Sequence, residues 1–270
     1  MKITFLGGGN MASALIGGLL NQGFSPEDIA MIEIDAKNRS RLVKAYGLRC
    51  FARPEDQAMQ CDALLLAVKP QQMREACASL PPFLKQQLVI SIAAGLRLAD
   101  LSRWLGGHDK LVRAMPNTPA LIGSGVTGLY ALPSVSEAER LGAERILQAV
   151  GRTLWVTDEA QIDAVTAISG SGPAYVFLFI EALQQAALTL GFTPGHARLL
   201  SIETMLGSAR LAAQSDEPAS LLRERVTSKG GTTEAALLRM AECGVKDGII
   251  AGVLAANARG AELGDLLGKD

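Results

Sequence analysis

The chain has few aromatic residues and almost no net charge, and both shortages argue against a nucleic-acid partner. Aromatic residues make up 4% of the 270 residues, and the formal net charge is −1 at pH 7. Proteins that bind nucleic acid usually present a basic surface, and those that bind single strands add aromatic stacking platforms. We therefore expect no nucleic acid as a partner.

Cysteine is also scarce and lacks a pairing pattern. The four cysteines form no CxxC pair and have no regular spacing: Cys50, Cys61, Cys77 and Cys243. This pattern argues against a disulfide framework and a structural zinc site, so we expect reduced thiols and no metal.

No stretch predicts export or membrane insertion. Strand-like sequence begins at Lys2, which leaves no room for a signal peptide. The most apolar helical stretch, 173–190, carries Glu181, Gln184 and Gln185, so it predicts a buried helix and not a membrane span. We expect a cytoplasmic protein with no membrane partner.

Hydrophobic residues are plentiful, at 49% of the chain, and they follow two patterns. In the first half, short apolar runs alternate with helical stretches such as Met11–Gln22, which is typical of a parallel sheet covered on both faces. The predicted strands are Ile3–Leu6, Ile29–Ile34, Ala63–Val68, Leu88–Ile92, Leu111–Met115, Gly125–Tyr130 and Thr153–Trp155. Beyond Asp158, predicted helices cover 159–168, 172–190, 195–213, 218–226, 232–243 and 246–265. We predict an α/β domain at 1–158 and an all-helical domain at 159–270.

The first predicted strand leads directly into a glycine-rich turn, Gly7-Gly8-Gly9-Asn10-Met11-Ala12, which opens a helix. This is the Gly-x-Gly-x-x-Ala form of the dinucleotide fingerprint. Gly7 permits the turn, Gly9 the close approach of a pyrophosphate, and Ala12 the tight packing of helix on strand. The motif and its place in the chain predict a Rossmann-type sheet whose turn binds a dinucleotide coenzyme.

An acidic residue near the end of the second strand bears on the choice of coenzyme. Asp35 stands where a carboxylate commonly receives the ribose hydroxyls, which favours NADH. Lys37 and Arg39 follow and offer charge for the 2′-phosphate of NADPH. The alternative interpretation is a helix cap at Asp35 and a solvated basic face.

Three further loops follow predicted strands and should face the same crevice. They contribute Val68, Lys69 and Pro70, then Ala93, Ala94 and Gly95, and finally Asn117 within Met115–Pro119. Small side chains after the fourth strand leave room for a nicotinamide, and Asn117 offers both a donor and an acceptor. A surface lysine and a plain turn are the competing interpretations of Lys69 and Asn117.

Two runs of hydroxyls and glycines mark the helical half. The run Thr227-Ser228-Lys229-Gly230-Gly231-Thr232-Thr233 precedes a predicted helix, whose free N–H groups suit a small carboxylate. The run Ser169-Gly170-Ser171-Gly172-Pro173 stands before another long helix. A pair of ordinary helix caps is the alternative, but two such runs suggest a shared substrate pocket.

Few residues of the predicted site could act as a general acid, and this limits the reactions that it can catalyse. His108 and His196 neighbour none of these motifs, and no lysine lies between Asp158 and Ser228. A reaction that needs no strong protein acid is therefore favoured. An imine fits, because its basic nitrogen can arrive protonated and its carbon accepts hydride.

Over almost its whole length the chain resembles pyrroline-5-carboxylate reductases. The segments that carry the resemblance are Phe5–Ala12, Ala67–Pro70, Arg113–Pro119, Ile168–Tyr175 and Val226–Thr233. It implies reduction of a cyclic imine to L-proline with NADPH or NADH, NADPH being favoured. It also implies a homodimer formed through the helical domain, often assembled into a larger homo-oligomer.

The resemblance also implies roles for individual residues. It places the substrate around Ser171, Ser228, Gly230, Gly231 and Thr232, and Thr233 near the ring nitrogen as the catalytic residue. Lys229 replaces a proline of many relatives, and Ile34-Asp35 replaces the polar–basic pair of NADPH-preferring ones.

Two alternatives remain at this stage. One is a related imine reductase or a 3-hydroxy-acid dehydrogenase, and the missing lysine counts against the latter. The other is a nucleotide-binding module without turnover, which the intact run before Thr233 disfavours.

Overall fold

The computed structural model describes residues 1–269 and contains two compact units. The first comprises Met1–Ser171 together with the segment from Ala256 onward, and the second comprises Gly172–Ala255. These units are defined by contacts, and they differ from the two predicted domains. The division of the chain into a coenzyme domain and a substrate domain at residue 158 stays a prediction.

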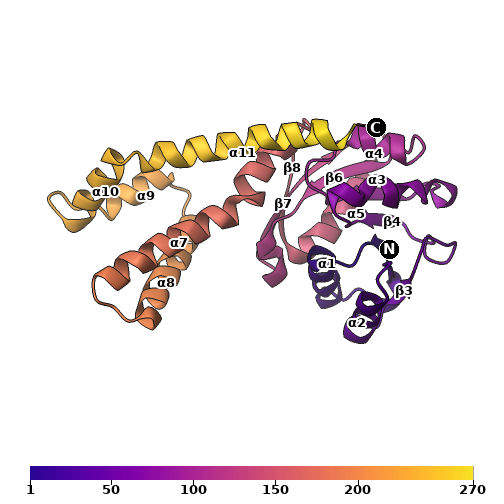
Figure 1. Cartoon of the computed structure of the whole chain (residues 1–270), viewed down its shortest axis with the longest axis horizontal. Helices are drawn as coiled ribbons and strands as arrows, with labels where there is room; N and C mark the ends of the chain where they lie inside the picture. Colours follow the sequence, from indigo (N-terminus) through magenta and orange to yellow (C-terminus); the bar gives the residue numbers. More distant parts are fainter. Residues whose placement is uncertain (270) are drawn as a thin grey trace. The chain divides into compact units, whose positions relative to one another are not determined.

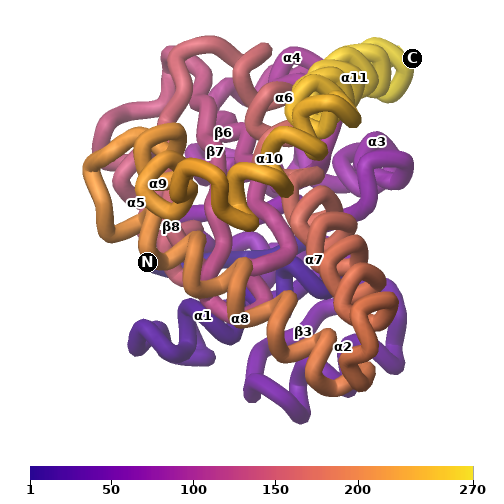
Figure 2. The backbone as a smooth tube through the Cα atoms, turned by 90° about the vertical axis from the view of Figure 1, so that its left-hand side faces the viewer, coloured from indigo at the N-terminus to yellow at the C-terminus, as the bar shows by residue number. Residues whose placement is uncertain are grey.

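The first unit is built on an eight-stranded sheet (Figure 1). In spatial order its strands are β3 (Arg49–Phe51), β2 (Ile29–Ile32), β1 (Ile3–Leu6), β4 (Ala63–Leu66), β5 (Leu88–Ser91), β6 (Leu111–Met115), β7 (Gly125–Ala131) and β8 (Gly151–Trp155). All neighbouring strands are parallel except β6 and β7, which lie side by side in both views (Figures 1 and 2). The carboxyl ends of β1 to β6 therefore share one edge of the sheet.

Helices cover both faces of this sheet, which is why β2, β1, β4 and β5 are buried at every position. Phe5 of β1 packs with one helical layer, whereas its neighbour Leu6 belongs to a second core on the opposite face. The covering helices and short helical turns are α1 (Asn10–Asn21), η1 (Pro26–Asp28), α2 (Ala36–Tyr46), α3 (Pro70–Ala78), η2 (Pro81–Phe83), α4 (Leu98–Trp104), η3 (Thr118–Ile122), α5 (Glu137–Leu147) and η4 (Gln148–Val150).

The first segment of this unit, Met1–Ser171, ends in α6 (Gln161–Val165) and a π-helical turn, η5 (Thr166–Gly170). The Ser169–Gly172 run is therefore part of the helical segment itself. The sequence-based prediction that it precedes the helix is corrected here, because a wider π turn accommodates the small residues without a break. Gly170 also leaves room for Met115, whose Cε would lie 2.7 Å from an added Cβ.

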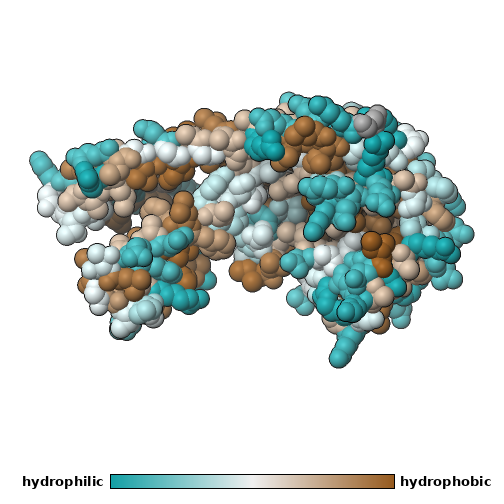
Figure 3. All heavy atoms as spheres, viewed as in Figure 1, coloured by the Kyte–Doolittle hydropathy of each residue, from teal (hydrophilic) through white to brown (hydrophobic). Residues whose placement is uncertain are grey.

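The second unit is entirely helical. It contains α7 (Gly172–Thr189), α8 (Pro194–Ala213), α9 (Ala219–Arg225), α10 (Thr232–Glu242) and the first part of α11 (Val245–Leu267). Within it only Ala197 and Ser201 are buried in the single chain. Brown, hydrophobic side chains lie at the surface of α7, α8 and α11 (Figure 3).

The prediction that helix 173–190 is buried is thus wrong for the isolated chain, because no residue of α7 is buried. The continuous helical segment Gln161–Thr189 has the length and composition of a membrane span, with 17% of its most apolar window buried. Core helices of soluble proteins pass the same test, so length and composition alone assign no membrane here.

All seven predicted strands are present, but the structure adds two elements. These are the short edge strand β3 and the helix α4. Neither has a clear sequence signal, since β3 holds three residues with only one strong β-former, and α4 has seven residues and no side-chain cap.

Candidate active site

The glycine-rich turn has the geometry that its sequence predicts. Gly7 has φ +96°, and a Cβ there would lie 2.7 Å from Cγ1 of Val68 and 2.8 Å from the carbonyl oxygen of Ala67. A larger residue is therefore excluded on both conformational and steric grounds. Gly9 is different, because a Cβ there would meet nothing within 4 Å. The space over Gly9 is open, as the approach of a ligand requires.

Helix α1 begins directly at this open space. Gly9 is its N-cap and provides no side-chain hydrogen bond, so the N–H groups of Asn10, Met11 and Ala12 form an uncapped first turn. Ala12 is 1% exposed and packs into the core, as predicted. The positive end of the helix dipole thus faces the opening, which suits an anion such as a pyrophosphate.

At the end of β2 the structure separates two acidic residues that the sequence analysis did not distinguish. Asp35 is the N-cap of α2, and its Oδ1 accepts the N–H of Asn38 at 2.7 Å. Glu33 faces the glycine turn, where its Oε2 accepts the N–H of Gly8 at 3.0 Å. The helix-cap interpretation of Asp35 is therefore confirmed, whereas a contact of Asp35 with ribose stays a prediction.

The two loops after β4 and β5 differ in what they present. Val68 is half-buried, Lys69 is exposed as the N-cap of α3, and Pro70 starts that helix. In the next loop Ala93 is 5% exposed, and only Ala94 of its three small residues is exposed. Gly95, at φ +76°, packs against Leu263 and Leu267 of α11, so its smallness accommodates a helix of the protein.

Asn117 connects the loop after β6 to the π turn. Its Nδ2 donates to the carbonyl oxygen of Ser169 at 3.1 Å, and its Oδ1 accepts the N–H of Val126 at 2.9 Å. The side chain is 9% exposed. Asn117 therefore positions the Ser169–Ser171 segment. Because it joins segments 52 positions apart in the chain, it does more than form a local turn.

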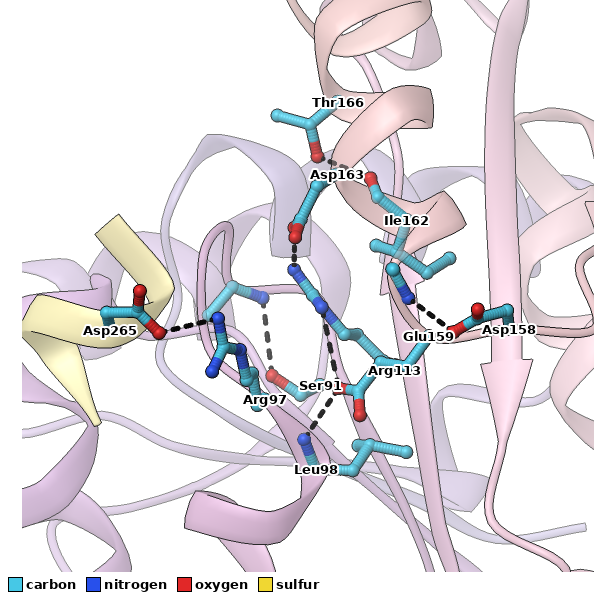
Figure 4. Close-up of polar contacts among 12 residues, drawn as sticks. Ser91, Arg97, Leu98, Arg113, Asp158, Glu159, Ile162, Asp163, Thr166 and Asp265 are labelled. Carbon is cyan, nitrogen blue, oxygen red and sulfur yellow. Dashed lines mark hydrogen bonds and ion pairs between the residues drawn. The ribbon is translucent and has the colours of Figure 1, made fainter. Parts of the chain in front are cut away.

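A buried ion-pair network, which the sequence analysis missed, holds the same region. Arg113 of β6 is 2% exposed, and it pairs with Glu159 at 3.4 Å and Asp163 at 2.5 Å (Figure 4). Glu159 also accepts the N–H of Leu98 at 2.7 Å. The network joins β6 to α6 just before the π turn. An arginine inside an otherwise apolar strand is the signal that could have revealed it.

In the second unit, the turn between α9 and α10 is built as predicted. Gly230 has φ +70°, Gly231 is the N-cap of α10 without a side-chain bond, and Thr232 and Thr233 open the helix. Glu234 lies in the first turn and its Oε2 accepts the N–H of Gly230 at 2.7 Å. The Thr hydroxyls are thus not used as the helix cap, which contradicts the competing interpretation of this run as a Gly C-cap followed by a Thr N-cap.

The residues predicted to bind the substrate fall in both units. Ser171 belongs to the first unit, whereas Ser228, Gly230, Gly231, Thr232 and Thr233 belong to the second. Ser228, Gly230 and Thr232 are exposed, and Thr233 is partly buried. The pocket that the two runs were predicted to share stays a prediction.

Three of the four cysteines have thiols whose pKa is raised. Burial raises the pKa of the Cys77 thiol to about 12, and burial likewise raises the pKa of Cys50 and of Cys61. Thiols of this kind are poor nucleophiles near neutral pH.

Comparison with known proteins identifies the family. The chain is 44% identical to the pyrroline-5-carboxylate reductase of Pseudomonas aeruginosa over 269 residues, which cover 99% of this chain and 98% of that one. The chain belongs to the pyrroline-5-carboxylate reductase family. A family model described as pyrroline-5-carboxylate reductase dimerisation matches residues 159–263, and one described as NADP oxidoreductase coenzyme F420-dependent matches residues 2–95.

Solved structures of pyrroline-5-carboxylate reductases share the fold. The enzyme from Coxiella burnetii matches with a TM-score of 0.91 at 40% identity, covering 97% of this chain and 98% of that one. The reductase of Plasmodium falciparum, solved with NADP bound, matches with a TM-score of 0.87 at 30% identity, covering 98% of both chains. The predicted fold class, a Rossmann-type sheet followed by a helical domain, is confirmed.

Proposed function

We propose that this chain reduces the cyclic imine 1-pyrroline-5-carboxylate to L-proline, the last step of proline synthesis, using NADPH or NADH. The observation that carries the proposal is the full-length likeness to pyrroline-5-carboxylate reductases, in which no predicted site segment falls outside the matched region. A non-catalytic nucleotide-binding protein would have no use for the intact run before Thr233.

The first unit fits a dinucleotide. The cradle over Gly9 is open, the N–H groups of Asn10 and Met11 lie in an uncapped first turn, and Gly7 fixes the path of the chain. These groups would hold the pyrophosphate. Val68, Lys69, Pro70, Ala93 and Ala94 would line the rest of the coenzyme site, and Asn117 would act there by holding the π turn.

When bound, the reduced nicotinamide supplies a hydride to the imine carbon and becomes oxidised. The ring nitrogen carries one proton on arrival and becomes a neutral secondary amine, which then takes a second proton from solvent. The chain has to orient the imine, bind its carboxylate and exclude competing water.

The second unit would bind the substrate. Ser228, Gly231 and Thr232, with the N–H groups at the start of α10, would hold the carboxylate. Ser171 would be a further substrate residue. Thr233 would hydrogen-bond the ring nitrogen. A threonine hydroxyl is too weak an acid to protonate it, so Thr233 orients the imine.

Association through the helical domain completes the proposal. In the second unit α7, α9 and α10 contain no buried residue, and large side chains such as Phe177, Leu199 and Ile249 are exposed. Apolar helices of this kind need a partner surface. We propose a homodimer in the cytoplasm, assembled further into a larger homo-oligomer.

A coenzyme-oxidation assay tests the function. Purified protein should consume NADPH or NADH only when a cyclic imino acid is present, with L-proline as the product. Steady consumption with a 3-hydroxy acid, and none with the imine, would assign the chain to another reaction. A single monomeric species in sedimentation at micromolar protein concentration would contradict the proposed homodimer.

A further inference from the structure

A cavity of about 280 Å³ lies beside the glycine-rich turn, at the carboxyl ends of β1, β2 and β4. Its walls include Gly7, Ile34, Pro54 and Val68, which offer apolar surface on several sides. Such a space next to a dinucleotide turn suits the adenosine half of a coenzyme. Asp35 does not line it, whereas Glu33 does.

Glu33 is the first residue after β2, and three hydrogen bonds fix its carboxylate. Its Oε2 accepts the N–H of Gly8 at 3.0 Å and Nδ2 of Asn38 at 2.8 Å, while its Oε1 accepts the N–H of Asp35 at 2.9 Å. Each of these partners donates a hydrogen bond to the carboxylate and so restricts its position. The carboxylate is thus a fixed negative charge at the wall of the cavity.

The two arginines of α2 nearest this corner, Arg39 and Arg41, donate hydrogen bonds to other groups of the protein and do not line the cavity. Nη1 of Arg39 donates to the carbonyl oxygens of Glu33 and Ile34 at 2.7 and 2.8 Å, so it caps the end of the strand. Arg41 donates from Nε to Oδ1 of Asn38 at 2.9 Å and from Nη2 to the carbonyl oxygen of Gly8 at 3.4 Å. The side chain that points outward at this corner is the apolar Ile34, which is 83% exposed.

Among the residues that line the cavity, the ionisable ones are two acids and one base. Glu33 and Glu75 carry negative charge, and Arg53 is the only cation. A ribose with free hydroxyls can donate to a fixed carboxylate, whereas a 2′-phosphate places up to two negative charges beside it. This arrangement discriminates by repulsion as well as by attraction.

We propose that Glu33, and not Asp35, receives the adenosine ribose hydroxyls, and that this chain binds NADH more tightly than NADPH. The inference rests on the coenzyme binding in the proposed function, but it does not depend on which imine is reduced. It reverses the preference for NADPH that the family resemblance favours.

The test is a titration of the full-length protein with NADH and NADPH, and with the fragments 5′-AMP and 2′,5′-ADP, in the absence of imine. The native protein should bind NADH at least about tenfold more tightly than NADPH, and 5′-AMP more tightly than 2′,5′-ADP. Glu33→Gln should reduce the NADPH/NADH ratio of dissociation constants about tenfold or more. A general loosening of the turn would weaken the binding of both coenzymes alike, so it would leave the ratio of their dissociation constants unchanged.

Asp35→Asn is the matched control, since asparagine keeps the helix cap and removes one charge two residues away. It should leave the ratio within about twofold. Arg53→Gln tests the opposite possibility, that the cavity holds a 2′-phosphate. Tighter native binding of NADPH, a ratio indifferent to Glu33→Gln, or a ratio that responds to Asp35→Asn instead would overturn the inference.

The imine-reduction assay separates the two proposals. A protein that shows the expected coenzyme ratios but reduces no cyclic imine refutes the proposed function and leaves the role of Glu33 intact. A protein that reduces the imine with NADPH preferred refutes the role of Glu33 alone. Failure to bind either coenzyme refutes both.

Discussion

The side-chain amide of Asn117 joins the loop after β6 to the π turn through its 3.1 Å hydrogen bond to the carbonyl oxygen of Ser169. Its other end accepts the N–H of Val126 at 2.9 Å, so both functional groups of the amide are used within the protein. This relationship makes the position of Ser171 depend on a residue far away in the chain. Asn117 is accordingly a positioning residue in our proposal.

Asn117→Ala should therefore loosen the π turn. It leaves the partly buried carbonyl of Ser169 and amide of Val126 without their partner, at a cost of about 1–3 kcal/mol in unfolding free energy. We expect kcat/KM for the imine to fall while the dissociation constant of the coenzyme changes little. Asn117→Asp keeps the acceptor for Val126 but turns a carboxylate oxygen toward the carbonyl oxygen of Ser169, so it should show the kinetic loss together with a loss of stability at least as large. Unaltered kinetics in both variants would reduce Asn117 to a fold residue.

Substitutions at Gly7 and Gly9 should have different effects: the first should lower stability, and the second should lower coenzyme affinity. Gly7→Ala places a Cβ within 3 Å of Val68 and the Ala67 carbonyl at φ +96°, and should lower the melting temperature clearly. A Cβ added at Gly9 would meet nothing within 4 Å, so for Gly9→Val we expect the fold to lose less than about 1 kcal/mol.

Coenzyme affinity gives the second half of this comparison. The side chain of Gly9→Val would occupy the space that a pyrophosphate needs, so we expect the affinity for both coenzymes to fall more than about tenfold. A folded Gly9→Val protein with native coenzyme affinity would show that the pyrophosphate does not pass over Gly9.

The glycine-rich turn and the strands of the sheet could be predicted from the sequence, because glycine conformation and apolar strand patterns depend on neighbouring residues in the chain. The choice between Glu33 and Asp35 does not, since it depends on where β2 ends. The predicted strand ran to Ile34, but β2 ends at Ile32, which makes Glu33 the acid at the crevice and Asp35 the helix cap. Strand ends shift by one or two residues without a sequence signal.

Polar contacts between residues far apart in the chain could not be predicted from the sequence either, because they too depend on the three-dimensional arrangement. Arg113 pairs with Asp163 across 50 positions, and no periodic pattern encodes such a partner. The exposure of α7 likewise depends on surfaces outside one chain. The apolar composition of this helix predicted burial, and the isolated chain does not provide it.

The buried network around Arg113 should be a major contributor to stability. Arg113→Ala leaves Glu159 and Asp163 as like charges without their counterion, and we expect a loss of about 3–5 kcal/mol in unfolding free energy. Arg259→Ala removes an exposed pair with Glu262, whose side chains are 58% and 62% exposed, and should change stability by less than about 1 kcal/mol. Denaturant unfolding measures both. Equal effects of the two substitutions would show that burial adds nothing to the Arg113 pairs.

Cys77 should resist alkylation in the native protein. Its pKa of about 12, raised by burial, leaves on the order of one thiol in ten thousand ionised at pH 8. Iodoacetamide followed by mass spectrometry should find Cys77 unmodified until the chain is unfolded in urea. Because the pKa is raised, reactivity should appear only as pH rises toward that value. Native labelling of Cys77 at the rate of the unfolded chain would contradict its burial on the inner face of α3.

The assignment of Thr233 is the sharpest test of the proposed chemistry. Its hydroxyl stands at the start of α10, after two glycines, and is not used to cap the helix. Hydrogen bonds to charged groups contribute roughly 1.5–3 kcal/mol, so Thr233→Ala should lower kcat/KM by about 10- to 100-fold. Coenzyme affinity should change little, and Thr233→Ser should retain most activity because it keeps the hydroxyl. Thr232→Ala is a useful companion: loss of a carboxylate contact should appear mainly in KM, whereas loss of the nitrogen contact should appear in kcat. Steady-state kinetics at saturating coenzyme distinguish the two, and near-native turnover in Thr233→Ala would remove Thr233 from the reaction.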